Sequence, residues 1–188
     1  LRISIVFLTI IISVKGQTGG DATYEFLNLS PNALLSSLGG TNVSLWGDDP
    51  NYYMQNPALL NELSCQQLAI NYTNYFAGIN YGSINYAMPY KNLGNFAAGI
   101  TYLNYGKFKK TDPSGNITGS FNAAEYAFNL IWSYNIDSLW NIGMNLKPVI
   151  SQMEQYNSLG LALDIGAAYH SRDGLMSAGL AMRNIGLQ

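Results

Sequence analysis

Apolar and polar residues alternate with a period of two over most of the chain beyond residue 66. In the stretch 124–134, even positions such as Phe128 are mostly apolar, while odd positions such as Asn129 are mostly small or polar. Because successive side chains of a β-strand point to opposite faces of a sheet, this period predicts strands with one apolar and one polar face. A change of apolar phase near Gly82 also predicts a β-bulge there. The pattern predicts seven strands, at 66–75, 79–88, 94–105, 124–134, 140–147, 159–170 and 175–185.

The length of these strands and the position of their aromatic residues favour a membrane β-barrel. Most of the strands span about 10 to 12 residues, which is the length a tilted membrane strand needs, whereas strands of globular sheets usually have five or six. Aromatic residues such as Trp132, Trp140 and Tyr169 lie near strand ends, where the interfacial girdles of a barrel would lie. We therefore expect an all-β fold, namely a transmembrane antiparallel β-barrel. The alternative is a soluble β-sandwich, because its strands also alternate.

The connectors between strands predict how such a barrel would be oriented. The longest, 106–122, is polar and contains three candidate surface-loop residues, Lys107, Lys109 and Lys110. Outer-membrane barrels have short periplasmic turns and longer extracellular loops, so we expect this connector outside and the short connectors 135–138 and 171–174 in the periplasm. Its lysines are usually interpreted as solvated charge, but they could contact anionic lipopolysaccharide or an acidic partner.

We expect the chain to be an incomplete fragment of a longer barrel. It begins with Leu1 rather than Met, and seven strands are an odd number, whereas bacterial single-chain barrels have even numbers. On this interpretation residues 66–188 form the first seven strands.

The first sixteen residues have the pattern of a secretory signal peptide. Arg2 precedes an apolar run, 3–14, that is shorter than the roughly 20 residues of a membrane-spanning helix. Val14 and Gly16 suit the positions before a cleavage site, so we expect residues 1–16 to direct export and then to be removed.

Residues 17–65 do not alternate clearly and are rich in turn-forming residues. Two short motifs stand out, Gly39-Gly40 and Asn56-Pro57-Ala58. We expect this segment to enter the barrel as a hatch-like element. The alternative, a mobile periplasmic leader, is less favoured because the segment contains Trp46 and many leucines.

The predicted inward face of the strands contains five lumen-facing candidates: Glu125, Lys147, Asp164, His170 and Arg183. The simplest interpretation is a charge-paired network that fixes the barrel interior or holds the hatch. The alternative is the lining of a substrate path.

Little in the sequence indicates an enzyme. The single histidine, His170, lies six strand residues from Asp164, which is about 20 Å and too far for a catalytic pair. Cys65 is alone, so it can form neither an internal disulfide nor a cysteine-rich metal site, and Pro50 after Asp48-Asp49 does not suit a calcium loop. The formal net charge of -2 does not favour nucleic acid. We therefore expect no catalytic residues, no cofactor and no metal.

Several motifs resemble the FadL-like outer-membrane barrels, a family that includes the PorV and PorQ proteins of the type IX secretion system. They are the Leu38-Gly39-Gly40 turn, the Asp48-Asp49 pair and the Asn56-Pro57-Ala58-Leu59 stretch, followed directly by strands. The stretches most similar to PorQ-like proteins are 21–27, 74–82, 104–108 and 145–148.

The resemblance implies a non-enzymatic role in the outer membrane. PorQ-like barrels belong to the complex that attaches secreted cargo to lipopolysaccharide, and they hold a PorZ-like surface subunit there, with PorU and PorV as further members. FadL-type transport of hydrophobic compounds is the main alternative, because it uses the same fold. A soluble adhesin is a third hypothesis.

Overall fold

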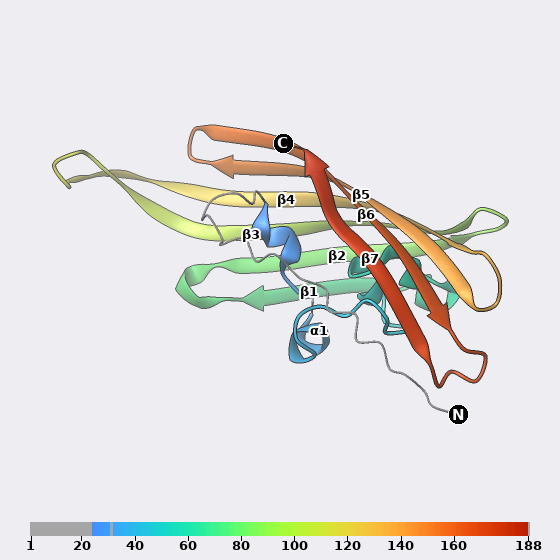
Figure 1. The fold of residues 1–188 in the computed structure, drawn as a ribbon. Helices are drawn as coiled ribbons and strands as arrows, with labels where there is room; N and C mark the ends of the chain where they lie inside the picture. The colour runs from blue at the N-terminus through green and yellow to red at the C-terminus, as the bar shows by residue number, and fades with distance from the viewer. Residues whose placement is uncertain (1–23, 31, 188) are drawn as a thin grey trace, which may run out of the picture.

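The computed structural model describes residues 24–30 and 32–187, and it is built on one antiparallel sheet (Figure 1). The sheet has seven strands that pair in chain order, each with the next. The expected all-β class and strand number are therefore confirmed. The expected signal peptide, residues 1–16, lies outside the described residues. The strands are β1 Leu68–Asn74, β2 Asn80–Tyr90, β3 Gly94–Thr111, β4 Ile117–Asn135, β5 Trp140–Met153, β6 Tyr156–His170 and β7 Ser177–Leu187.

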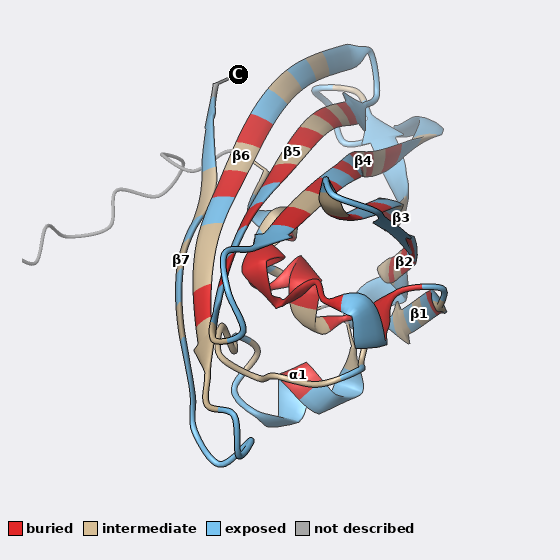
Figure 2. Ribbon diagram, turned by 90° about the vertical axis from the view of Figure 1, so that its right-hand side faces the viewer, coloured by how far each residue is buried: buried red, intermediate tan, exposed pale blue. Residues whose placement is uncertain are grey.

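The sheet curves around the described part of the chain that precedes β1, which we call the N-terminal segment (residues 24–65) (Figure 2). β1 and β7 are the two edges of the described sheet, so the sheet is curved but not closed. None of the helices in the described part of the chain has both the length and the hydropathy of a membrane-spanning helix. The short helices are η1 Glu25–Asn28, α1 Ala33–Ser37, η2 Tyr52–Met54, η3 Pro57–Leu59 and η4 Glu62–Ser64, with η5 Phe76–Gly78 between β1 and β2.

Asparagine side chains cap the N-termini of three of the short helices. Asn32 Oδ1 accepts from Leu35 N at 2.9 Å, and Asn56 Oδ1 accepts from Ala58 N at 3.0 Å. Asn61 forms a capping box with Ser64 at the start of η4. These side chains satisfy backbone donors that have no partner within the helix. The turn-forming composition of the N-terminal segment therefore encodes a series of capped turns.

The inner and outer faces of the strands follow the predicted alternation. On β4, Asn129 points inward and is buried, while Phe128 and Leu130 point outward and are exposed. The inner face is packed against the N-terminal segment, where Tyr53 and Leu60 form a buried cluster with inward residues of β2, β3 and β4. Further inward polar residues are buried, among them Asn85, Asn95, Thr101, Asn141 and Asn145.

The predicted long loop at 106–122 is wrong. β3 and β4 continue as a paired ribbon to a tight turn at 112–116, and this hairpin projects beyond the neighbouring strands (Figure 1). Lys107, Lys109 and Lys110 therefore lie on a strand rather than on a loop. The prediction failed because this ribbon is polar or exposed on both sides, so it lacks the apolar face that identifies a strand in the sequence.

The predicted bulge at Gly82 is also wrong, because β2 pairs with both neighbours without a register shift. The apparent change of phase arises from Tyr81, which points inward and packs against Phe26 of the N-terminal segment. An irregularity does lie between Asn104 and Lys107, where β3 has one residue more than β4. The apparent phase change near Gly82 therefore reflects an inward apolar contact of Tyr81 and not a bulge.

Candidate functional site

The inner face of β5 and β6 contains a buried ion pair. Lys147 Nζ lies 2.5 Å from Asp164 Oδ2, and the two side chains are only 4% and 1% exposed. Asp164 faces Asn145 across the β5–β6 ladder, so Lys147, two positions further along β5, is its diagonal neighbour on the same face. Two of the five predicted lumen-facing residues therefore contact each other.

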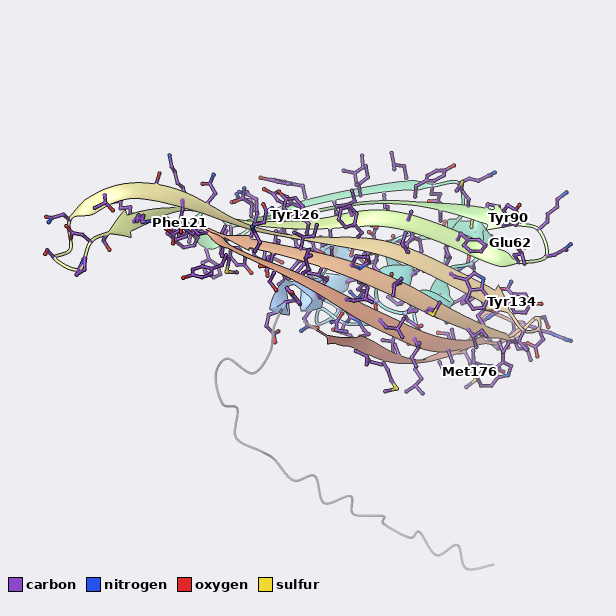
Figure 3. All side chains as sticks on the ribbon, turned by 90° about the horizontal axis from the view of Figure 1, so that it is seen from above. Glu62, Tyr90, Phe121, Tyr126, Tyr134 and Met176 are labelled. Atoms are coloured by element: carbon purple, nitrogen blue, oxygen red, sulfur yellow. The ribbon has the colours of Figure 1, made fainter. Side chains whose placement is uncertain are left out.

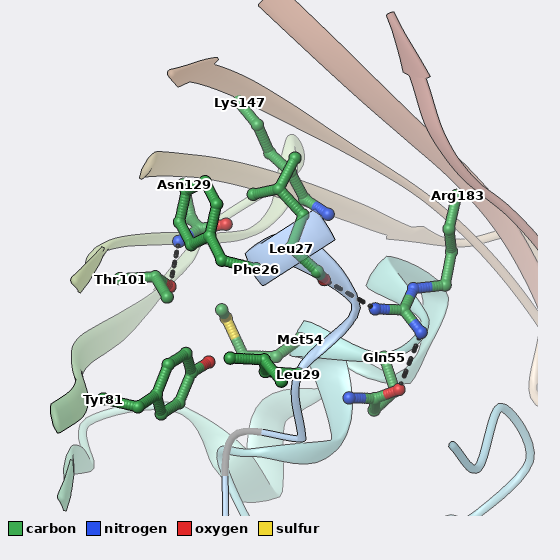
Figure 4. A pocket seen from close by; sticks show the side chains of 10 residues that line it. All are labelled: Phe26, Leu27, Leu29, Met54, Gln55, Tyr81, Thr101, Asn129, Lys147 and Arg183. Atoms are coloured by element: carbon green, nitrogen blue, oxygen red, sulfur yellow. Dashed lines mark hydrogen bonds between the residues drawn. The ribbon is translucent and has the colours of Figure 1, made fainter. Parts of the chain in front are cut away.

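A third lumen-facing residue, Arg183, connects β7 to the N-terminal segment (Figure 4). Its guanidinium donates to Gln55 Oε1 at 2.9 Å and to the carbonyl oxygen of Leu27 at 3.3 Å. Asp164 is near enough to Arg183 for an attractive Coulombic interaction. The single carboxylate of Asp164 thus balances two cations, Lys147 and Arg183.

Asn184, which the sequence did not single out, completes this network. It has a positive φ of 55°, and β6 and β7 change register between Leu163 and Ile165. Its backbone N–H donates to Asp164 Oδ1 at 2.8 Å, and its side-chain oxygen accepts from Lys147 Nζ at 2.9 Å. Its amide nitrogen donates to Asn28 Oδ1 at 2.8 Å. The register change brings adjacent residues of β7 to the interior, which strict alternation cannot predict.

Amide side chains extend the network across the sheet. Asn145 Nδ2 donates to Asn129 Oδ1 at 3.2 Å, and Asn129 Nδ2 donates to Thr101 Oγ1 at 3.1 Å. Glu125, the fourth predicted lumen residue, lies apart and accepts a 2.6 Å hydrogen bond from the Tyr105 hydroxyl. It belongs to the inner face, but within the described residues no hydrogen bond joins it to the Lys147–Asp164 pair.

Little space remains beside the charged network. The cavity bordered by Lys147, Arg183, Gln55, Asn129 and Phe26 has a volume of about 20 Å³. That is roughly the space of one water molecule. The charged network is therefore closely packed, and it joins the sheet to the N-terminal segment.

The Asn56-Pro57-Ala58 motif is seated on glycines of the inner face. A Cβ atom at Gly143 would overlap the Pro57 backbone, and one at Gly166 would overlap Asn56 Oδ1. A Cβ atom at Gly179 would overlap the carbonyl oxygen of Val43. Glycine on three adjacent strands thus leaves the space that the N-terminal segment occupies.

Hydrogen bonds fix the motif on this glycine seat, formed by Gly143, Gly166 and Gly179. Asn56 Nδ2 donates to the carbonyl oxygens of Val43 at 2.8 Å and Ala167 at 3.2 Å. Gly39 and Gly40, the other predicted hatch motif, are not part of this seat and follow α1. They have φ values of 97° and 85° and end α1, a conformation that favours glycine.

His170 contacts the N-terminal segment at the end of β6. Its ring stacks on Trp46 with centroids 3.7 Å apart and an interplanar angle of 9°. Its Nδ1 is buried without a hydrogen-bond partner among the described residues. His170 thus belongs to the packing of the N-terminal segment and not to the Lys147–Asp164 pair. Within the described residues, no three His, Cys, Asp or Glu side chains are grouped to hold a metal ion.

A separate apolar pocket lies between η1 and the β1–β2 turn. Its volume is about 290 Å³. Sequence reasoning missed it because its wall combines residues that are far apart along the chain. It is lined by Glu25, Phe26, Leu29, Tyr75, Phe76, Ile79, Leu103 and Tyr105.

Comparison with known proteins adds no relative: no protein-family model and no curated protein sequence matches this chain.

Proposed function

We propose that this chain forms part of the wall of an outer-membrane β-barrel whose interior is filled by its own N-terminal segment. The single observation that carries the proposal is the inverted distribution of side chains, apolar outside and polar inside. Leu130 on β4 is 53% exposed and Leu161 on β6 is 50% exposed, although both belong to long regular strands. In contrast, Lys147 and Asp164 are buried on the inner face.

This distribution suits lipid better than water. Soluble monomers rarely expose contiguous apolar patches larger than a few hundred Å². A barrel in a bilayer instead turns an apolar band toward lipid and a polar face toward its interior. Outward residues of all seven strands contribute to such a band, among them Ile70, Ile84, Ile100, Phe128, Leu130, Met144, Leu161, Ile165, Leu180 and Met182.

Aromatic residues border the outward band at two levels. Tyr102 and Tyr126 pack together with ring centroids 4.9 Å apart on the side of the β3–β4 hairpin. Tyr90 and Tyr134 lie toward the opposite end (Figure 3). Tyr126 and Tyr134 are eight positions apart on β4, which is about 27 Å along a strand. That spacing is close to the length of a tilted strand that crosses the apolar core.

The packed interior supports a scaffold more than a conduit. The N-terminal segment is hydrogen-bonded to Arg183 and seated on Gly143 and Gly166, and the adjoining cavity holds only about 20 Å³. Together with the resemblance to PorQ-like proteins, this supports a role in the attachment complex of type IX secretion. There the barrel would hold a PorZ-like surface subunit, beside PorU and PorV, for anchoring cargo to lipopolysaccharide.

The apolar pocket of about 290 Å³ favours a second candidate function. Its lining of Phe26, Leu29 and Leu103 suits a hydrophobic compound, so FadL-type transport remains the alternative. A transporter would have to displace the N-terminal segment from the glycine seat.

The membrane position can be tested with two exposed residues of β4. Leu130→Arg lies within the proposed lipid band, where arginine costs roughly 2–4 kcal/mol near mid-bilayer. Ile117→Arg is the control, since Ile117 is 62% exposed but lies at the tip of the projecting hairpin. We expect Leu130→Arg to reduce heat-modifiable protein in the outer membrane and Ile117→Arg to leave it unchanged. If the outward face were in water, both substitutions would be tolerated equally, because exposed positions usually change stability by less than about 0.5 kcal/mol.

The two functions can be separated in a deletion strain. A scaffold predicts that secreted cargo is released from the cell surface while uptake of long-chain hydrophobic compounds is unchanged. Loss of uptake with cargo still attached would instead favour the transporter.

A further inference from the structure

The projecting β3–β4 hairpin has two different faces, and the irregularity at residues 104–107 sets them. In the part of β4 that follows the projecting hairpin, even-numbered residues such as Tyr126 point outward. The same alternation extends into the hairpin, so Asn122 and Ser120 also point outward. The extra residue of β3, next to Gly106 with its φ of 82°, places Lys107 opposite Asn122 and Lys109 opposite Ser120. Both lysines therefore share the outward face of the sheet.

The third lysine has a different environment. Lys110 lies opposite Gly119 and shares the inner side of the hairpin with Phe108, which stacks on Phe121 at 5.4 Å. Its Nζ is 2.5 Å from Glu154 Oε1 in the β5–β6 turn. The charge of Lys110 is thus balanced within the chain.

Lys107 and Lys109 have no ion-pair partner among residues 24–30 and 32–187. The nearest acidic residue along the hairpin, Asp112, is used in the turn, where its carboxylate accepts from Ser114 N at 2.9 Å and Asn116 N at 2.8 Å. Hydrogen bonding, first from the Asn116 side chain and then from these backbone donors, lowers the pKa of Asp112, so its carboxylate is held in the charged, acceptor form. The outward face of the hairpin therefore has two lysines without an ion-pair partner among the described residues, while the negative charge of Asp112 is held in the turn.

The position of this charge relative to the aromatic level indicates its partner. Asn122 is four positions beyond Tyr126 on β4, about 13 Å along the strand, and Ser120 is about 20 Å beyond it. With the usual barrel tilt, Lys107 and Lys109 would lie about 10–15 Å beyond the aromatic level. This is just above the headgroup layer, which is roughly 5–8 Å thick on each side of the bilayer, and it is on the side of the strand that faces lipid.

We propose that Lys107 and Lys109, with Ser120 and Asn122 beside them, bind phosphate groups of lipopolysaccharide in the outer leaflet. Lysine ammonium groups bind phosphate as point charges, and the hydroxyl and amide side chains supply further hydrogen-bond donors. A lipid headgroup fits better than an acidic protein, because the two lysines are on the same outward face of the sheet as the apolar band. They do not point along the strands toward the space beyond the membrane. The inference rests on the proposed membrane position and names a lipid ligand that this position does not by itself require.

The test uses the full-length protein purified in neutral detergent. Binding is measured for lipopolysaccharide and for the same lipopolysaccharide after removal of its phosphates. We expect the double variant Lys107→Gln/Lys109→Gln to bind intact lipopolysaccharide about 10- to 30-fold more weakly. The reason is that each basic residue near an anionic membrane surface strengthens binding by roughly fivefold. Lys110→Gln is the matched control and should stay within about twofold of wild type. Dephosphorylated lipopolysaccharide should bind wild type and double variant equally weakly.

Three outcomes would overturn the proposal. They are equal binding by wild type and double variant, undiminished binding after dephosphorylation, and lysine-dependent binding of a synthetic polyglutamate peptide with none of lipopolysaccharide. The last would assign the surface to an acidic protein segment. Outer-membrane fractionation and heat-modifiable migration of the wild type test the membrane position separately, so a failure of the lipid proposal can be distinguished from a failure of the membrane position.

Discussion

Asn56 occupies, with its side-chain oxygen, the space that a side chain at Gly166 would need. The same Asn56 side chain donates a 3.2 Å hydrogen bond to Ala167, the next residue of β6. This hydrogen bond joins residues that are 111 positions apart. The N-terminal segment can be seated there only because Gly166 of β6 has no side chain.

Gly166→Ala should loosen the N-terminal segment. The added methyl group must displace Asn56 or shift β6, and such overpacking typically costs about 1–3 kcal/mol. Gly119→Ala is the control, because a Cβ atom at Gly119 meets nothing within 4 Å. We expect a lower urea midpoint for Gly166→Ala alone, measured by tryptophan fluorescence of the full-length protein in detergent. Equal midpoints for the two variants would contradict the seat.

Asp164→Asn should destabilise the protein more than Lys147→Met. The first change leaves Lys147 and Arg183 without their shared counter-charge, and breaking a buried pair costs roughly 3–5 kcal/mol. The second leaves Asp164 with Arg183 nearby and with the 2.8 Å bond from Asn184 N, so we expect about 1–3 kcal/mol.

The double variant Lys147→Met/Asp164→Asn should cost less than the sum of the two single changes, because the partners interact directly. Urea unfolding of all four proteins provides the coupling energy. Additive effects, or a larger effect of Lys147→Met, would argue against the charge balance described above.

Cys65 should react slowly in the folded protein. Burial, with a smaller contribution from Glu62, raises the pKa of the Cys65 thiol to about 11. At pH 8 the thiolate would be about 0.1% of the folded form, against roughly a quarter for an unperturbed thiol of pKa about 8.5. Iodoacetamide labelling, which is specific because the chain has one cysteine, should be at least about 100-fold slower in native protein than in denaturant.

The same shift of the Cys65 pKa predicts a pH dependence. A pKa that is higher in the folded state contributes stability that is fully present below about pH 8.5 and is lost as pH rises through about 11. Cys65→Ser should remove this component of the alkaline loss of stability. A variant with an unchanged alkaline profile would show that the thiol is not responsible.

A protease site inserted at Ser114 should be cleaved on intact cells, whereas one at Asp137 should be protected. Ser114 lies in the tight turn of the projecting hairpin, and Asp137 lies in the β4–β5 turn at the opposite end of the strand. Cleavage products detected by immunoblotting distinguish the two sites. The reverse pattern would invert the proposed orientation.

Local patterns predicted much of the sheet. Alternation around Asn129 identified the strands and their inner face because the side-chain period of a strand is a local property. In the structure, Lys147 and Asp164 are buried on the inner face, and Arg183 is hydrogen-bonded to the N-terminal segment. It failed at 106–122, where both faces of the ribbon are polar or exposed, and at Gly82, where inward Tyr81 imitated a bulge.

The all-β class, the seven strands and the residue types of the inner face followed from the alternation of apolar and polar positions. The folded chain was needed to show that Lys147 pairs with Asp164, that Asn184 joins them, and that Asn56 is seated on Gly166. The same applies to the difference between Lys110, which is bound to Glu154, and Lys107 and Lys109, which have no ion-pair partner in the described part of the chain. The physical reason is that register and irregularities between strands set these contacts, and a shift of one residue reverses which side chains meet.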